Sequence, residues 1–506
     1  MTGVAPNRVV MFQPKRAVEP PGNTLFLAAI LPFQPTDYMK KNALLLLFLA
    51  LPLAGNTQPA ADTALYAVAK RHPLPAWFQD AKLGIFIHWG LYSVPAWASP
   101  VGEPGSVPWP VWFKNNAYAE WYANTLKFRD SPTWAHHRAT YGENFDYYQF
   151  IPLFNQGLQH WQPDAWANLL AESGARYVVL TTKHHDGFTL WPSQVRNPHF
   201  PTSQPTVARD LVGDLTRAVR KRGLTMGLYY SGGLDWSFNP KPIAHLNELY
   251  PSMPTDSAYG AYVDAHYREL IDRYQPDILW NDIGYPAKGD LPAMLASYYN
   301  ARPNGVVNDR WAKWGVYNGE YDTPEYTVLK TTSARKWETC RGLGYSFGYN
   351  QREDVSHVLS GKALVHLLVD VVSKNGNLLL NIGPKADGTI PAIQADRLQQ
   401  LGKWLAVNGE AIYGTRPYTR PEATTPDSIS VRFTQKTDTL YATLLKRPTR
   451  RQVIIPGLTL PARSRVALLG VPGHQKWANQ AGQVRIDLPA RLPDSPAYVI
   501  RVVSRY

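Results

Sequence analysis

Short apolar runs that end in polar or aromatic side chains recur along this chain and constrain its fold more than any other feature. The runs begin near residues 84, 177, 226, 277 and 378, and helix-patterned stretches separate several of them. Parallel strands that are covered on both faces have continuous apolar sequences, and strands that alternate with helices form parallel βα units. Eight such units can close into a (β/α)8 barrel, in which the groups at the carboxyl ends of the strands carry the chemistry. The pattern predicts an α/β fold with a (β/α)8-like, TIM-type barrel, and a site where its strands end.

The expected elements follow from the spacing of apolar residues. We expect strands at 83–88, 176–182, 224–230, 277–281, 305–308, 326–329, 343–347 and 377–382. Helical spacing predicts helices at 164–174, 210–223, 259–274, 291–301, 362–373 and 392–407. After about residue 414 the apolar period falls to two, as in antiparallel strands. We therefore expect the barrel at 60–415, a proline-containing linker at 417–426 and a C-terminal antiparallel β-sandwich at 420–506.

The N-terminal region has the features of a targeting signal. A basic start at Met39 precedes an apolar stretch that ends near Ala54, where small and polar residues follow. This order is typical of a secretory signal peptide, and the apolar stretch is short for a membrane span. We expect residues 39–55 to be a signal peptide and 1–38 to be an untranslated upstream extension. The alternative is a true extension with a buried apolar helix. Cleavage after the signal would give a secreted or periplasmic protein.

Composition and charge bear on whether the protein binds nucleic acid or spans a membrane. The 506 residues carry a formal charge of +13, with 44% hydrophobic and 18% charged residues, which is a globular composition. Positive charge could indicate nucleic acid, but the densest basic cluster, 217–222, lies at the end of an amphipathic helix, where cations suit the helix dipole. We expect no nucleic-acid partner and no membrane span, and the oligomeric state is left open. Cys340 is the only cysteine, so no internal disulfide can form.

Asp282 is the first candidate for catalysis, because it ends a predicted strand directly after Trp280 and Asn281. A carboxylate on a barrel strand is costly to bury without partners, although a solvated helix cap is the alternative. One reaction that such a carboxylate could serve is glycoside hydrolysis. It would need a second carboxyl, since one group protonates the leaving oxygen while the other attacks or activates water. Spacing alone does not choose among the downstream candidates, which are Glu320, Asp322, Glu325 and Glu338.

Three histidines, His88, His184 and His185, follow the first two predicted strands. Histidine is the commonest transition-metal ligand, which raises the possibility of a metal site. However, adjacent strand residues point to opposite faces, so His184 and His185 would share an ion only if the strand has ended. Neutral imidazoles both donate and accept hydrogen bonds, which suits sugar hydroxyls. We therefore expect substrate binding by these histidines, without a metal or another cofactor.

Two further places could contribute to a pocket. Glu120 and Trp121 lie in the long loop after the first strand, and long loops at this end of a barrel shape the substrate site. Arg310 lies at another predicted strand end, where it could bind substrate or form a structural ion pair with Asp309 or another nearby acid.

Seven segments, taken together, resemble the α-L-fucosidases of glycoside hydrolase family 29. They are FIHWG at 86–90, YAEWY at 118–122, TKHHDGF at 182–188, YYSGGLDW at 229–236, LWND at 279–282, NDRW at 308–311 and GNLLLNIGP at 376–384. They follow the order of the family and cover residues 65–415 densely. The C-terminal part resembles the family's β-sandwich more loosely.

The resemblance implies a retaining exo-hydrolase that removes terminal α-L-fucose from fucosylated glycans by double displacement, without a metal. It implies that Asp282 is the nucleophile and Glu325 the acid/base. The implied substrate-binding residues are His88, Tyr118, Glu120, Trp121, His184, His185, Tyr230, Trp280 and Arg310. The alternatives are a secreted carbohydrate-binding protein on an inactive barrel and a glycosidase for another sugar, such as galactose.

Overall fold

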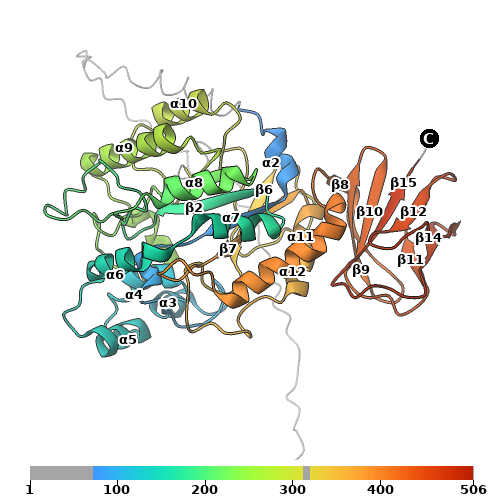
Figure 1. Cartoon of the computed structure of the whole chain (residues 1–506), viewed down its shortest axis with the longest axis horizontal. Helices are drawn as coiled ribbons and strands as arrows, with labels where there is room; N and C mark the ends of the chain where they lie inside the picture. Colours follow the sequence, from blue (N-terminus) through green and yellow to red (C-terminus); the bar gives the residue numbers. More distant parts are fainter. Residues whose placement is uncertain (1–71, 312–318, 505–506) are drawn as a thin grey trace, which may run out of the picture. The chain divides into compact units, whose positions relative to one another are not determined.

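A parallel sheet of seven strands forms the centre of the N-terminal part of the chain (Figure 1). The computed structural model describes residues 72–311 and 319–504, so the predicted signal peptide and upstream extension lie outside the described residues. The strands are β1 (Leu83–Ile87), β2 (Tyr177–Lys183), β3 (Thr225–Ser231), β4 (Ile278–Asp282), β5 (Val306–Val307), β6 (Trp337–Gly342) and β7 (Gly376–Ile382). Their order in the sheet is β5-β4-β3-β2-β1-β7-β6. This TIM-like half-barrel confirms the predicted fold class.

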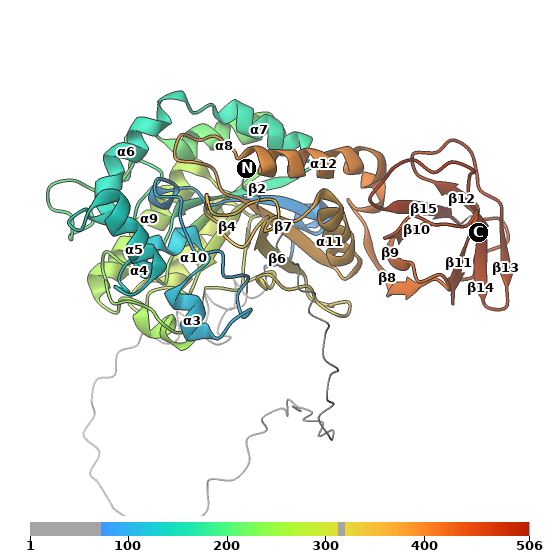
Figure 2. The ribbon, with the colours of Figure 1, turned by 90° about the horizontal axis from the view of Figure 1, so that it is seen from below.

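All six predicted helices form. They are α7 (Pro163–Glu172), α8 (Leu211–Lys221), α9 (Ser257–Tyr274), α10 (Leu291–Ala301), α11 (Gly361–Ser373) and α12 (Ala392–Asn408). Helix α8 begins where the side chain of Asp210 accepts a hydrogen bond from the amide of Gly213, and it ends before Gly223, which has a φ of 72°. Helix α7 packs between α8 and α12 (Figure 2). None of the helices within the described ranges is long and apolar enough to cross a membrane.

Shorter helices occupy the loops. The α-helices among them are α2 (Ala76–Ala81), α3 (Trp109–Lys114), α4 (Tyr122–Thr125), α5 (Pro132–Tyr141) and α6 (Phe150–Gly157). The 3-10 helices are η1 (Leu91–Ser93), η2 (Ala119–Trp121), η3 (Tyr147–Gln149), η4 (Leu158–His160), η5 (Leu246–Glu248), η6 (Tyr250–Ser252) and η7 (Gly409–Ala411). Most of these lie between β1 and β2 or between β3 and β4.

Two of the predicted strands are wrong. Residues 326–329 and 343–347 form no strand, and β6 lies between them instead. Its sequence, WETCRG, mixes charged, polar and aromatic residues, so it does not resemble an apolar run. Within the described residues, isolated parallel bridges connect β5 to β6, and they join Asn308 to Tyr321, Asp322 to Trp337 and Glu325 to Cys340. The segment 321–325 therefore takes the place of an eighth strand.

Strand alternation separates an inner face from an outer face. Tyr229 on β3 is paired with Trp280 on β4, and both belong to the same buried cluster as Phe86 and Val179. The alternate residues of the strands pack in a second cluster with the helices. Paired residues of parallel strands face the same side, so Tyr229 and Trp280 both point into the barrel.

The C-terminal part is a β-sandwich with its own apolar core, as predicted. Its strands are β8 (Arg416–Thr424), β9 (Ser430–Lys436), β10 (Thr439–Leu444), β11 (Gln452–Pro456), β12 (Arg465–Leu468), β13 (Trp477–Gln480), β14 (Gln483–Asp487) and β15 (Tyr498–Val503). The antiparallel sheets have the orders β12-β15-β10-β9-β8 and β11-β14-β13. The predicted linker is wrong, because most of it forms β8. This strand lies at a sheet edge and its register shifts between Pro417 and Glu422, and an edge tolerates proline.

A buried carboxyl lies inside the barrel on β6. The side chain of Glu338 is completely buried and accepts hydrogen bonds from the hydroxyl of Tyr177 and, at 3.2 Å, from Nε1 of Trp280. Burial raises the pKa of Glu338 to about 7, although the two hydrogen bonds oppose this shift. The unfolded chain ionises this group near pH 4.3. The stabilisation that Glu338 provides while protonated is therefore lost as the pH rises toward about 7.

We expect Glu338→Gln to remove this pH dependence, because the amide does not titrate. Between about pH 4 and pH 7 the free energy of unfolding of the wild type should fall relative to that of the variant by roughly 2–3 kcal/mol. Urea denaturation at several pH values measures the difference. Glu143→Gln, at a side chain that is 65% exposed, is the matched control and should follow the wild type. Parallel pH profiles for the wild type and Glu338→Gln would contradict this prediction.

Candidate active site

A cavity of about 400 Å³ opens at the carboxyl ends of the barrel strands. Ten of the eleven predicted site residues line it: His88, Tyr118, Glu120, Trp121, His184, His185, Trp280, Asp282, Arg310 and Glu325. The eleventh, Tyr230, is not part of its lining. Strand ends and loops that are far apart in the sequence thus contribute to one cavity.

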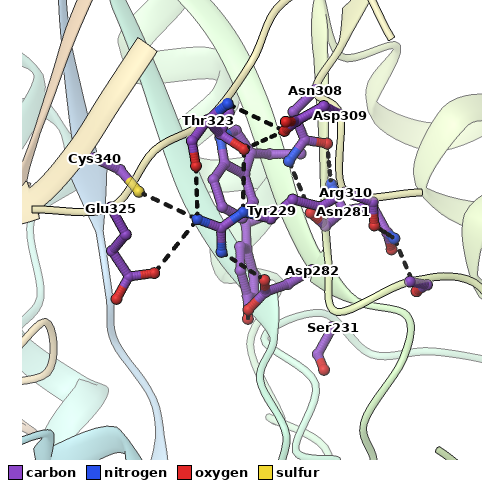
Figure 3. A network of polar contacts seen from close by, with 12 residues as sticks. Tyr229, Ser231, Asn281, Asp282, Asn308, Asp309, Arg310, Thr323, Glu325 and Cys340 are labelled. Carbon is purple, nitrogen blue, oxygen red and sulfur yellow. Dashed lines mark hydrogen bonds and ion pairs between the residues drawn. The ribbon is translucent and has the colours of Figure 1, made fainter. Parts of the chain in front are cut away.

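Arg310 lies between the two predicted catalytic carboxyls (Figure 3). Its Nη1 is 2.9 Å from Oδ1 of Asp282, and its Nη2 is 3.4 Å from Oε2 of Glu325. Thr323 fixes the guanidinium, since its hydroxyl lies 3.1 Å from Nε and its carbonyl oxygen 3.0 Å from Nη2. Burial disfavours the charge of Arg310, but the surrounding acids, Asp282 foremost, raise its pKa overall, so it remains protonated. One cation therefore holds both carboxyls at the same cavity.

Asp282 has partners for both of its carboxyl oxygens. Oδ1 is paired with Arg310, and Oδ2 accepts a hydrogen bond of 2.9 Å from the hydroxyl of Tyr229. The strand end that carries it is held by Asn308, whose amide group exchanges hydrogen bonds of 3.0 and 2.9 Å with the backbone of Asn281. These contacts offset the cost of burying a carboxylate and leave Asp282 in a defined orientation.

Of the four downstream candidates for the second carboxyl, Glu325 is the one that lines the cavity. Its Oε1 accepts a hydrogen bond of 2.6 Å from Tyr118, and its side chain is 32% exposed, against 12% for Asp282. Among the described residues, the other downstream candidates have different partners. Glu320 binds Tyr299 and the amide of Val307, Asp322 binds Arg335, and Glu338 binds Tyr177 and Trp280.

Glu120 supplies a buried carboxyl of a different kind. It lies on η2 and is 1% exposed, and its Oε2 accepts hydrogen bonds from the amide of Gly348 at 2.7 Å and from Ser346 Oγ at 3.4 Å. Burial raises the pKa of Glu120 to about 8, although these bonds oppose the shift. At neutral pH the group is mainly protonated, and it can donate a hydrogen bond to a ligand.

The three histidines are neutral. Burial lowers the pKa of His88 to about 4 and that of His185 to about 3, and it lowers the pKa of His184 as well. His88 Nδ1 lies 2.7 Å from Oδ1 of Asn381, and His185 Nδ1 lies 2.6 Å from Oγ of Ser231. Strand β2 ends at Lys183, so strand alternation does not separate His184 from His185. In the described part of the chain, no group of three or more His, Cys, Asp or Glu side chains is arranged to hold a metal ion.

The structure places Tyr229, rather than the predicted Tyr230, in the cavity. Tyr230 points to the other side of β3, where its hydroxyl lies 2.9 Å from Nδ1 of His266. Tyr229 is paired with Trp280, which places both side chains on the inner face of the sheet. This register between β3 and β4 could not be predicted from the sequence. Phe347 and Cys340 also line the cavity. Both were missed because β6 and the segment after it were misassigned.

The arrangement is suited to nucleophilic catalysis combined with acid/base catalysis on an uncharged ligand that carries several hydroxyl groups. Two carboxyls share one guanidinium, while neutral imidazoles and a protonated carboxyl provide donors and acceptors around them. Aromatic rings supply the remaining wall, and such rings pack on the apolar faces of sugars.

Known proteins with similar sequences and structures include several α-L-fucosidases. A family model described as alpha-L-fucosidase matches residues 54–410, and one for the alpha-L-fucosidase C-terminal domain matches 424–503. The human tissue alpha-L-fucosidase is 34% identical and aligns over 90% of this chain and 94% of its own length. The bovine tissue alpha-L-fucosidase is 33% identical and aligns over 88% of this chain and 92% of its own length.

The solved structure of the Thermotoga maritima alpha-fucosidase in complex with fucose is 45% identical. It superposes with a TM-score of 0.78 over 86% of this chain and 98% of that one. Similarity therefore extends through both the half-barrel and the sandwich. The chain belongs to the α-L-fucosidase family, glycoside hydrolase family 29.

Proposed function

We propose that this protein is a retaining exo-α-L-fucosidase that releases terminal α-L-fucose from fucosylated glycans. The observation that carries the proposal is the pair Asp282 and Glu325, both held by Arg310 at a single cavity. The family membership of the chain supports the same activity. An inactive barrel that only binds carbohydrate would have no need of such a pair.

In the first step Asp282 attacks the anomeric carbon of fucose, and the protonated Glu325 donates its proton to the departing glycosidic oxygen. In the second step Glu325 takes a proton from water, which attacks the same carbon, releases Asp282 and restores the α configuration. A retaining pair of carboxyls lies roughly 5–5.5 Å apart, and contact of both with one guanidinium is compatible with that separation. Arg310 and Tyr229 hold Asp282 in position for the attack.

Fucose is favoured over galactose by the nature of the cavity wall. The two sugars share a hydroxyl pattern, but C6 of fucose is a methyl group. The aromatic ring of Trp121, which lines the cavity and packs edge-on against His185 with ring centroids 5.3 Å apart, offers an apolar surface for that methyl group. His88, His184 and the protonated Glu120 then bind the sugar hydroxyls.

We also propose that the protein is exported. The signal peptide at 39–55 would direct it to a secreted or periplasmic location, and residues 1–38 would not be translated. The mature chain would consist of the catalytic barrel, 60–415, and the C-terminal sandwich, 420–506.

Asp282→Ala should reduce kcat on an aryl α-L-fucoside by more than roughly 10³-fold, because no nucleophile remains. Added azide should restore part of the activity and yield the inverted fucosyl azide, which NMR identifies. Asp354→Ala, at a carboxylate that is 68% exposed, is the control and should retain normal activity. Near-normal turnover by Asp282→Ala would remove this residue as the nucleophile.

Glu325→Ala should slow the hydrolysis of fucosides with poor leaving groups by roughly 10²–10⁴-fold, because the departing oxygen is no longer protonated. Activated aryl fucosides, whose leaving groups need less protonation, should lose much less. A series of aryl α-L-fucosides of increasing leaving-group pKa measures the contrast through kcat/KM. Equal losses across the series would point to another acid.

Tyr229→Phe should lower kcat/KM on an aryl α-L-fucoside by roughly tenfold or more, because Asp282 loses a hydrogen bond to a charged oxygen. Tyr230→Phe is the matched control in the same strand, and its main effect should be a lower melting temperature. Steady-state kinetics and thermal denaturation of both variants separate the two roles. A larger kinetic loss for Tyr230→Phe would overturn this assignment.

A further inference from the structure

Exposed apolar side chains occur on two segments that also contribute residues to the lining of the cavity. Among the described residues six large hydrophobic side chains are exposed, and three of them, Val111, Leu246 and Tyr250, lie on the two loops that border the cavity. The cavity lining itself includes Pro104 and Trp109 from one loop and Leu246 and Leu249 from the other. We call these four lining residues the apolar rim. None of them is charged, and Leu246 is 46% exposed.

A chain of aromatic contacts connects this rim to the acid/base. The hydroxyl of Tyr118 donates to Glu325, and the ring of Tyr118 packs edge-on against Trp112 with centroids 4.9 Å apart. Trp112 in turn packs edge-on against Trp109 at 5.8 Å. Trp112 is buried, whereas Trp109 is half-buried at the cavity lining. Trp109 therefore lies on the Glu325 side of the cavity.

The chemistry fixes which part of a substrate lies on that side. Glu325 has to reach the glycosidic oxygen, so the sugar that departs with this oxygen must extend past Glu325. The groups that bind fucose hydroxyls, such as His88, His184 and Glu120, are buried deeper in the cavity. The apolar rim is thus placed to contact the leaving group rather than fucose.

We propose that Trp109 and Leu246 form a leaving-group subsite that binds the sugar next to fucose through the apolar face of its pyranose ring. This inference rests on the proposed fucosidase activity. The indole of Trp109 provides the stacking surface, and Leu246 offers a second apolar contact. These apolar contacts favour a leaving sugar that turns the apolar face of its ring toward the indole.

The test compares a substrate that reaches the rim with one that cannot. The first is the fucosyl disaccharide that the wild-type protein hydrolyses fastest. The second is α-L-fucosyl fluoride, whose leaving group is a single atom. We expect Trp109→Ala to lower the ratio of kcat/KM for the disaccharide to kcat/KM for the fluoride by about tenfold, mainly through KM. Trp109→Phe should restore much of the ratio, and Leu246→Ala, at an exposed position, should shift it in the same direction.

Val111→Ala is the matched control, because Val111 lies on the same helix as Trp109 and is exposed but does not line the cavity. It should leave the ratio at the wild-type value. An unchanged ratio in both Trp109→Ala and Leu246→Ala would overturn the subsite, and so would equal losses on both substrates. Failure of the wild type to hydrolyse either substrate would instead overturn the fucosidase activity itself.

Discussion

The guanidinium of Arg310 is the group on which the rest of the site depends. The side chain of Asp282 is only 12% exposed, so its charge is costly to desolvate, and a nearby positive charge offsets that cost. Arg310 supplies this charge at 2.9 Å from Asp282 and 3.4 Å from Glu325. It is itself oriented by Thr323, which lies in the segment that precedes Glu325. The proposed nucleophile, the cation and the proposed acid/base are therefore positioned together.

The half-barrel makes this convergence possible. Asp282 lies at the end of β4, Arg310 follows β5, and Glu325 lies in the segment that links β5 to β6. Because neighbouring parallel strands end at the same edge of the sheet, residues 43 positions apart in the chain meet there. The long loops after β1 and β3 then add Glu120, Trp121 and the apolar rim to the lining of the same cavity.

Much of this organisation could be predicted from the sequence, because a buried parallel strand requires a continuous apolar run. That requirement identified β1 to β4 and β7, and helical periodicity identified the six principal helices. It failed for β6, whose inward-facing Glu338 and Cys340 interrupt the apolar pattern. It also could not distinguish Tyr229 from Tyr230, because the choice depends on the pairing of β3 with β4. Glu325 could be singled out only by resemblance, since its location depends on bridges between segments that have no strand pattern of their own.

The two carboxyls that we propose as catalytic lie on backbone segments of different regularity. Asp282 ends β4, which is paired along its length with β3, whereas Glu325 belongs to the segment 321–325, which is joined to its neighbours by isolated bridges. A covalent bond forms only along a narrow line of approach, but a proton can be transferred over a wider range of angles. The segment that carries the proposed proton donor can therefore diverge in length and sequence during evolution without displacing the proposed nucleophile. Enzymes built on this scaffold can acquire new leaving-group preferences while the reaction at the anomeric carbon stays the same.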